Sequence, residues 1–241
     1  MLIAGEAGVG KSYLGLGAAH DLATGGCLWG IPELIIPTPA PVLYIDQELG
    51  DFAFQKRVKE VYGARNVAPP SNIYVVSVDA ELELDTPVGQ KRLEGYIEES
   101  GALIVIVDVI SEAMWGDESS NTDVRRVFQH LAKIQAKWRK EGLSVILLHH
   151  TRKPPASSRD REDYDPFSFH NVRGASKWAG SVDTMAMAVE LPPSETAPGE
   201  WKRLEIGWPK HRHFEGGRID KMALKEWGVL AALKKTALRA F

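Results

Sequence analysis

Residues 5–12 read Gly5-Glu6-Ala7-Gly8-Val9-Gly10-Lys11-Ser12, which are the residue types and spacing of a phosphate-binding loop. Small residues let consecutive backbone N–H groups turn toward one phosphate, and the helix that follows points the positive end of its dipole at that anion. The apolar run at 1–4 predicts a strand before the loop, and residues 13–22 predict a helix after it. A glycine-rich turn that matches by accident is the alternative, and the flanking strand and helix argue against it. The sequence therefore predicts a site for a nucleoside triphosphate.

The loop supplies most of the expected nucleotide contacts. Lys11 can reach the β- and γ-phosphates, and the Ser12 hydroxyl can join the ligand shell of a Mg²⁺ ion. We expect nine consecutive residues to bind the nucleotide: Gly5, Glu6, Ala7, Gly8, Val9, Gly10, Lys11, Ser12 and Tyr13.

The composition is that of an ordinary soluble globular protein, with 241 residues, 44% hydrophobic and 25% charged. This length favours one α/β domain over residues 1–241. A net charge of −3 gives no long-range attraction to nucleic acid, so any such contact needs a local basic patch. The single cysteine, Cys27, argues against a disulfide framework and favours a reducing, cytoplasmic setting. No apolar run approaches the length of a membrane span, so we expect no membrane partner.

Strand and helix signals alternate along the chain, which predicts a mainly parallel sheet with helices on both faces. Thr86-Pro87 predicts the start of a helix that Gly101 ends, and residues 123–140 predict a helix with one apolar stripe and a solvated basic face. A helical tail is expected at 220–241. The expected strands are 42–45, 73–76, 103–107, 144–148, 184–190 and 203–208.

Carboxylates follow two of these apolar runs, at the point where each predicted strand ends. Ligands of open α/β sheets bind beyond the carboxyl ends of the strands, so Asp108 is expected to hold Mg²⁺ directly or through water. A carboxylate that merely caps a turn is the alternative. Glu48 is the expected group that positions or deprotonates the attacking water, with Asp46 as its competitor and a solvated loop carboxylate as the plain alternative.

Two adjacent histidines, His149 and His150, follow the run at 144–148. A polar side chain at this strand end can hydrogen-bond the γ-phosphate and lose that bond after hydrolysis, which would make a switch. Adjacent residues of an extended chain point in opposite directions, so the pair is not expected to bind a metal together. One of the two could instead be a packed core histidine.

The composition changes between residues 150 and 172, where prolines and mixed charges predict a long mobile surface loop. Its basic residues include Arg152 and Lys153, and acidic residues of the same loop cancel this charge. A groove that follows a single strand should be positive and should offer aromatic rings for stacking. The aromatic residues of the loop could stack on bases or anchor the loop to the body; they are Tyr164, Phe167 and Phe169.

Further basic residues lie far from the phosphate loop in sequence. Arg173 follows the long loop, and Lys210 and Arg212 follow the last predicted strand. Such residues can act on their own nucleotide or on that of a neighbouring subunit, where an arginine stabilises charge in the transition state of phosphoryl transfer. Ordinary surface charges are the alternative.

In this order the motifs resemble those of the RecA-like ATPases, and within them the RepA-type hexameric replicative helicases. The similarity extends from Gly5 to about Gly217. Its most specific parts are Leu147-Leu148-His149-His150 and Arg173-Gly174-Ala175-Ser176, because many unrelated ATPases share the phosphate loop.

The resemblance implies a RecA-like P-loop fold, with a five-strand parallel core extended by antiparallel strands on the C-terminal side. It implies ATP with Mg²⁺, bound between the subunits of a homo-oligomer that we expect to be a hexamer. Lys11, Glu48, His149 and His150 would serve catalysis in one subunit. Lys210 and Arg212 would reach the ATP of the next.

The same resemblance implies that the segment from Arg152 to Val172 lines a central channel and contacts single-stranded DNA, with Arg152, Lys153 and Arg173 as the contacting cations. The leading hypothesis is therefore an ATP-hydrolysing, ring-forming motor that acts on single-stranded DNA. Two others stay open: a recombinase-type DNA filament ATPase, and a nucleotide-gated binding or loading module without motor activity.

Overall fold

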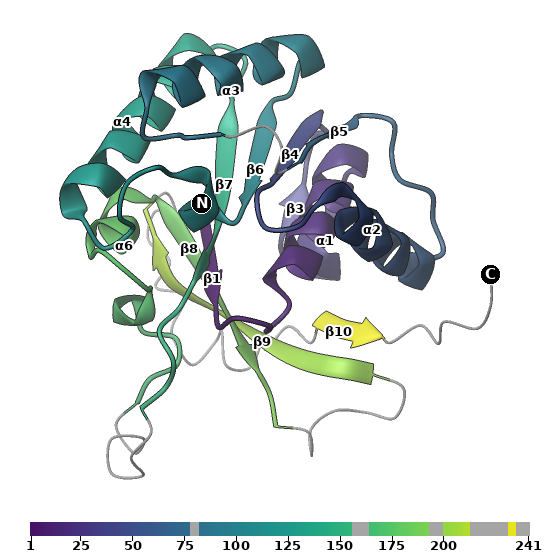
Figure 1. The fold of residues 1–241 in the computed structure, drawn as a ribbon. Coiled ribbons are helices and arrows are strands. Elements are labelled where there is room, and N and C mark those ends of the chain that lie inside the picture. The colour runs from purple at the N-terminus through teal and green to yellow at the C-terminus, as the bar shows by residue number, and fades with distance from the viewer. Residues whose placement is uncertain (78–81, 156–163, 193–199, 213–230, 235–241) are drawn as a thin grey trace.

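The computed structural model describes residues 1–77, 82–155, 164–192, 200–212 and 231–234. Within these residues, eight strands form one sheet in the order β10-β9-β8-β1-β7-β6-β4-β5 (Figure 1). A separate two-stranded hairpin pairs β2 (Gly26–Cys27) with β3 (Ile35–Ile36). The strands of the large sheet are β1 (Leu2–Gly5), β4 (Val42–Asp46), β5 (Ile73–Val76), β6 (Ile104–Asp108), β7 (Ser144–His150), β8 (Thr184–Glu190), β9 (Glu200–His211) and β10 (Ala231–Lys234).

The centre of the sheet is parallel, as the alternating pattern predicts. Strand β1 pairs with β7 on one side and β8 on the other, with Leu2 opposite both Leu147 and Met185. The expected parallel core of five strands therefore has a sixth, because the chain crosses beyond β1 before β8 and keeps its direction. The antiparallel extension is confirmed and consists of β9 and β10.

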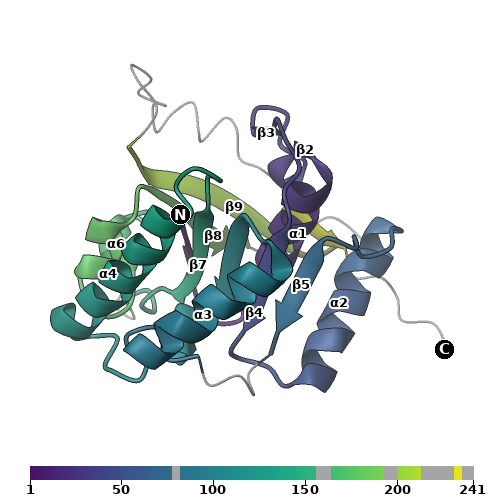
Figure 2. The ribbon, with the colours of Figure 1, turned by 90° about the horizontal axis from the view of Figure 1, so that it is seen from above.

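Helices cover both faces of the sheet (Figures 1 and 2). On one face, α1 (Lys11–Thr24) and α2 (Asp51–Arg65) pack on Ile3, Tyr44 and Ile106. On the other, α3 (Pro87–Ser100), α4 (Asn121–Lys137) and α6 (Lys177–Ser181) pack on neighbouring residues of the same strands, such as Leu2, Leu43 and Val105. Because successive strand residues face opposite sides, the central strands β1, β4, β6 and β7 contribute to both cores, which explains their almost continuous apolar runs.

The boundaries of α3 follow the expected capping chemistry. The Thr86 side chain accepts a hydrogen bond from the Gly89 N–H, and Gly101 ends α3 with a φ of 63°, which a residue without a Cβ adopts at low cost. In α4 the apolar stripe is buried and the basic residues are exposed; Lys137, for example, pairs with Glu94 and Glu98. The basic face of α4 is thus a solvated face.

The C-terminal expectation was wrong where the structure describes it. Ala231–Lys234 forms β10 and pairs antiparallel with β9, although residues 220–241 were expected to be helical. Residues 231–234 pair with the open edge of β9, and the hydrogen bonds of this pairing outweigh the small difference between the local preferences for helix and strand. The remainder of the tail, 220–230 and 235–241, lies outside the described residues.

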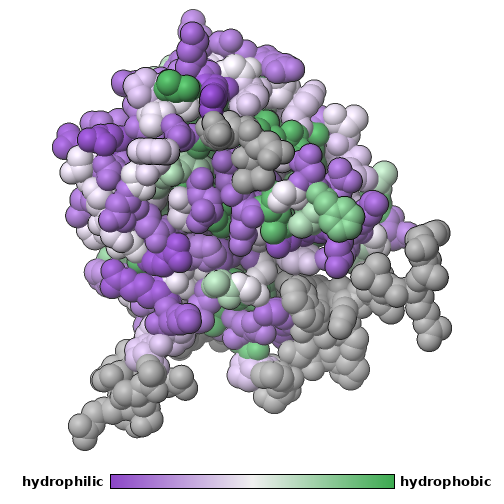
Figure 3. All heavy atoms as spheres, viewed as in Figure 1, coloured by the Kyte–Doolittle hydropathy of each residue, from purple (hydrophilic) through white to green (hydrophobic). Residues whose placement is uncertain are grey.

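The surface in the view of Figure 3 is mostly hydrophilic, with small separate hydrophobic patches. Among the described residues, none of the helices is both long and apolar enough to cross a membrane.

Candidate functional site

Four neighbouring parallel strands bring the predicted residues to one edge of the sheet. Their order is β1-β7-β6-β4, and they end in the phosphate loop, the histidine pair, Asp108 and the Asp46–Glu48 turn. A loop at the carboxyl end of each strand therefore faces the same space, which is where open α/β sheets bind ligands. The convergence predicted from the sequence is present.

The phosphate loop needs its glycines for two different reasons. Gly8 and Gly10 have φ values of 78° and 109°, in the left-handed region that a side chain disfavours. A Cβ on Gly5 would lie 2.8 Å from the Val9 side chain and 2.9 Å from the Ala188 carbonyl oxygen, so this position has no room for one. The loop conformation is thus fixed by its residue types.

Lys11 lies inside this loop and is buried. Its Nζ donates to the carbonyl oxygens of Gly5 at 3.0 Å and Glu6 at 2.9 Å, and to Nδ1 of His150 at 3.1 Å. Burial lowers the pKa of Lys11 to about 8, and the negative charges of Asp108 and Glu48 oppose that shift. A partly desolvated ammonium with acidic neighbours is suited to bind phosphate oxygens.

Asp108 and Ser12 form the part of the site that could hold a cation. Oδ2 of Asp108 accepts a hydrogen bond from the Tyr44 hydroxyl at 2.7 Å, whereas its buried Oδ1 has no hydrogen-bond partner among the described residues. Burial raises the pKa of Asp108, and the Tyr44 and Ser12 hydroxyls partly offset this. An unpartnered carboxylate oxygen beside a serine hydroxyl fits the oxygen ligands that Mg²⁺ prefers. No cluster of three His, Cys, Asp or Glu side chains in the described part of the chain could hold a metal alone.

The two candidate carboxylates after β4 have different surroundings. Asp46 is buried, and its Oδ1 accepts the N–H groups of Glu48 and Leu49, both at 3.3 Å, so it holds the turn in shape. Burial raises the pKa of Asp46 to about 6. Glu48 is exposed and lies near enough to Lys11 and Asp108 to raise the pKa of both. This geometry favours Glu48 as the group that faces a nucleotide.

The adjacent histidines point to opposite sides of β7. His150 contacts Lys11, as above, while the fully buried His149 packs on Trp178 with ring centroids 4.7 Å apart. Nε2 of His149 donates to the Arg173 carbonyl oxygen at 3.0 Å. Burial lowers the pKa of each histidine to about 4, so both are neutral at physiological pH. His150 belongs to the phosphate site, and His149 is a packed core residue.

A family model described as an AAA domain matches residues 1–156, which is 156 of the 241 residues. The chain belongs to this family of AAA domains. The match covers the phosphate loop and the strand ends that carry Glu48, Asp108 and His150. A comparison with curated proteins returned no match.

Membership of the AAA family makes this protein a nucleotide-binding P-loop ATPase. The side chain of Tyr13, which directly follows the phosphate loop, points to α2 and not into the loop, since its hydroxyl donates to Glu60 at 2.5 Å. Nucleotide contact by Tyr13 would therefore come from its backbone.

Two residues expected at a catalytic centre lie away from the phosphate loop of this AAA domain. The Lys210 ammonium donates to the carbonyl oxygens of Ala179 at 2.6 Å and Gly180 at 3.1 Å. The Arg212 guanidinium donates to the same Gly180 oxygen at 3.0 Å and lies 3.4 Å from Asp183. Both cations are thus gathered at the end of α6, and neither contacts Lys11.

The cations expected to contact DNA lie at the base of the long loop. Arg152 and Lys153 are exposed, and Arg152 donates to the Gly174 carbonyl oxygen at 3.4 Å. Arg173 pairs with Glu118, with 2.6 Å between Nε and Oε1. Thr151 and Val172 form an antiparallel bridge that brings the two ends of the loop together. Residues 156–163 of this loop lie outside the described residues.

Two further charged residues near the site were not predicted. Arg57 of α2 is close enough to Asp46 and Asp108 for its positive charge to lower the pKa of both, against the larger opposite effect of burial. Lys202 of β9 donates to the Gly8 carbonyl oxygen at 2.9 Å. Arg57 was missed because α2 buries only Phe54, Val61 and Tyr62, and a helix with so little apolar periodicity does not show which residues face the site. Lys202 was missed because nothing in the sequence links it to a loop 194 residues away.

Proposed function

We propose that this AAA domain hydrolyses ATP between the subunits of a ring and uses the energy to move along single-stranded DNA. One observation carries the proposal. The adjacent residues His150 and His149 connect the phosphate loop to the base of the long loop: His150 contacts Lys11, and His149 donates to the Arg173 carbonyl oxygen. A change at the γ-phosphate therefore has a short path to the loop expected to contact DNA.

Backbone hydrogen bonds reinforce this path. The Thr151 N–H donates to the Gly5 carbonyl oxygen at 2.9 Å, and the Arg173 N–H donates to the His150 carbonyl oxygen at 2.9 Å. The end of β7 is thus bonded to the first residue of the phosphate loop and to the first residue after the long loop. Motion of one can bias the other without an intervening hinge.

The residues of the site divide the chemistry of hydrolysis between them. Lys11 binds the β- and γ-phosphate oxygens, and Glu48 accepts the proton of the water that attacks the γ-phosphorus. The bond from this phosphorus to the bridging oxygen breaks, which leaves ADP and inorganic phosphate. Ser12 and Asp108 would hold a Mg²⁺ ion, whose chemistry is to neutralise the charge of the phosphate oxygens.

Lys210 and Arg212 support the ring. They are held together at the end of α6 and do not contact the phosphate loop of their own chain. A cation pair placed in this way can serve a nucleotide on a neighbouring subunit, where it would stabilise the charge of the transition state.

Two measurements test this function. ATP turnover is measured with and without single-stranded DNA at low salt, and the particles formed with a non-hydrolysable ATP analogue are imaged with and without DNA. We expect stimulation by DNA and closed rings. Filaments would favour a recombinase-type protein instead. Tight ATP binding without turnover would favour a nucleotide-gated loading module, and the absence of both DNA binding and stimulation would refute the motor.

A further inference from the structure

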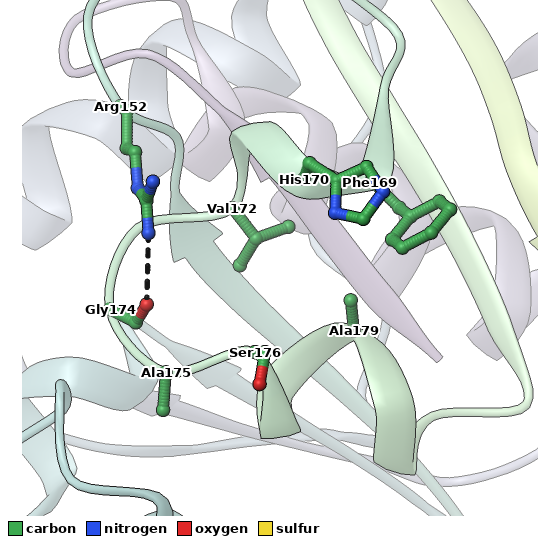
Figure 4. Close-up of a pocket in the computed structure, with 8 residues that line it drawn as sticks. All are labelled: Arg152, Phe169, His170, Val172, Gly174, Ala175, Ser176 and Ala179. Atoms are coloured by element: carbon green, nitrogen blue, oxygen red, sulfur yellow. Dashed lines mark hydrogen bonds between the residues drawn. The ribbon is translucent and has the colours of Figure 1, made fainter.

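A second hollow, separate from the phosphate loop, lies between the end of the long loop and α6. It has a volume of about 200 Å³ (Figure 4). Arg152 and Gly174 lie on one side of it, and Phe169 and His170 lie on the other. The remaining wall consists of small or apolar side chains together with one hydroxyl: Val172, Ala175, Ser176 and Ala179. The composition is that of a slot for a flat ring with a polar edge.

Phe169 does not have the role of an anchor for the loop. The residue is 43% exposed, and its ring lies beside that of His170 with centroids 4.0 Å apart and planes inclined by 37°. Phe167 is the anchor, because it packs on the main hydrophobic core and lies against Gly207, where a Cβ would clash with its ring. Two aromatic residues of one loop are thus used in different ways.

The charges around the hollow suit a polyanion. Arg152 lines the hollow and is exposed, as is the next residue, Lys153. Among the described residues, the Arg152 guanidinium donates one hydrogen bond, a long one of 3.4 Å to the Gly174 carbonyl oxygen. Two acidic residues described near the hollow have partners of their own: Glu118 pairs with Arg173, and Asp165 accepts the Phe167 N–H at 3.0 Å. A phosphate group beside the Arg152 guanidinium would meet a positive charge.

We propose that this hollow receives one base of single-stranded DNA, which stacks on the exposed face of Phe169 while Arg152 contacts an adjacent phosphate. The inference rests on the proposed function and names the part of the DNA that the loop reads. Stacking on an aromatic side chain is independent of base identity, because every base has a π-face. This suits a protein that moves along a strand irrespective of its sequence.

The position of the hollow gives the contact a second consequence. Gly174 and Ala175 follow Arg173, whose carbonyl oxygen accepts the His149 hydrogen bond. Occupation of the slot would therefore be sensed at the end of β7, one residue from the contact between His150 and Lys11. This path supplies a route by which DNA stimulates ATP turnover.

The experiment compares two DNA probes that differ only in their bases. Fluorescence anisotropy at low salt measures the binding of the protein to oligothymidylate and to an abasic strand of the same length. We expect Phe169→Ala to weaken binding to oligothymidylate about ten-fold, the scale of one base–aromatic stack, and to leave abasic binding unchanged. Phe169→Trp should restore binding and show quenched emission with oligothymidylate alone.

Tyr74→Ala is the matched control. Tyr74 is 42% exposed on β5, the strand at the opposite edge of the sheet from β9 and β10. The Tyr74→Ala variant should therefore bind both probes as the unmodified protein does. Equal losses on both probes, or no loss at Phe169→Ala, would overturn the base slot and leave the proposed function intact. If the unmodified protein binds neither probe, the proposed function fails and the slot fails with it.

Discussion

The Nζ atom of Lys11 lies 3.1 Å from Nδ1 of His150 and donates to it, while two loop carbonyl oxygens accept its other hydrogen bonds. The lysine that is expected to bind phosphate is therefore fully engaged by the protein. Phosphate oxygens must replace some of these partners, and the neutral imidazole of His150 is then free to bond a phosphate. In the mechanism that we propose, the first residue to respond to the nucleotide is therefore His150, at the end of the strand that leads to the long loop.

Lys11 is the only lysine among residues 5–12, so replacing it by alanine removes the ammonium that the phosphate loop itself carries. We expect Lys11→Ala to lose nucleotide binding by 100-fold or more, roughly the cost of leaving buried phosphate charge unpaired. Isothermal titration with an ATP analogue measures this. Lys91→Ala, which removes an exposed lysine of α3, is the control and should bind normally. Unchanged affinity of the Lys11 variant would show that ATP binds elsewhere.

Glu48→Gln separates binding from hydrolysis. The amide keeps the size of the side chain but cannot accept the proton of the attacking water, so turnover should fall by about 10² to 10⁴ while ATP affinity changes little. Steady-state phosphate release and analogue binding measure the two. If the glutamine variant turns over ATP at a substantial rate while Asp46→Asn does not, the base is Asp46.

Asp46→Asn also tests the cost of a buried charge. The pKa of Asp46 is raised from 3.8 to about 6, so between these pH values the folded protein binds more protons than the unfolded chain and loses stability as pH rises. The neutral asparagine can still accept the two N–H bonds of the turn. We expect the asparagine variant to unfold at a higher urea concentration than the unmodified protein at pH 7.5. Its free energy of unfolding should be larger by at most about 3 kcal/mol. The free energies of unfolding of the two proteins should become equal near pH 4, where Asp46 is protonated in the folded state. An equal difference at pH 7.5 and pH 4 would show that the buried charge is not its cause.

The two histidines should fail in different ways. His150→Ala removes the acceptor beside Lys11, so turnover should fall by about ten-fold or more with little change in melting temperature. His149→Ala leaves a cavity beside Trp178, so it should lower the free energy of unfolding by about 2 to 4 kcal/mol.

Because burial lowers the pKa values of His149 and His150 to about 4, the pH profile of turnover should show no histidine ionisation near 6.5. A transition there that His150→Ala removes would place a charged imidazole in the site.

Lys202 should position the phosphate loop from outside. Its ammonium donates to Gly8 and pairs with Glu190 at 2.6 Å, so it fixes the loop to β8 and β9. We expect Lys202→Met, which keeps the apolar stem, to weaken nucleotide binding about three- to ten-fold, the scale of one charge-assisted hydrogen bond. Glu190→Gln should have a smaller effect, because the bond to Gly8 remains. A larger effect of the glutamine variant would mean that the ion pair, and not the loop contact, matters.

Local patterns were sufficient to predict most of the fold and the core of the site. Apolar runs predicted β4, β6 and β7, and the residues that follow those runs proved to share one sheet edge. Contacts between distant segments could not be predicted in this way. The direction of β8, the pairing of β10 with β9 and the approach of Lys202 to Gly8 all depend on which strands become neighbours, and hydropathy along the chain carries no record of that.

The position of β1 has a consequence for how the molecule is made. Both partners of this strand lie far along the chain: Leu2 pairs with β7 only after residues 144–150 have left the ribosome, and with β8 only after residues 184–190 have followed. The nucleotide pocket is therefore completed late in synthesis, after the chain segments around β4, β5 and β6 have emerged. A nascent chain that stalls before β7 would present β1 to chaperones as an unpaired apolar strand.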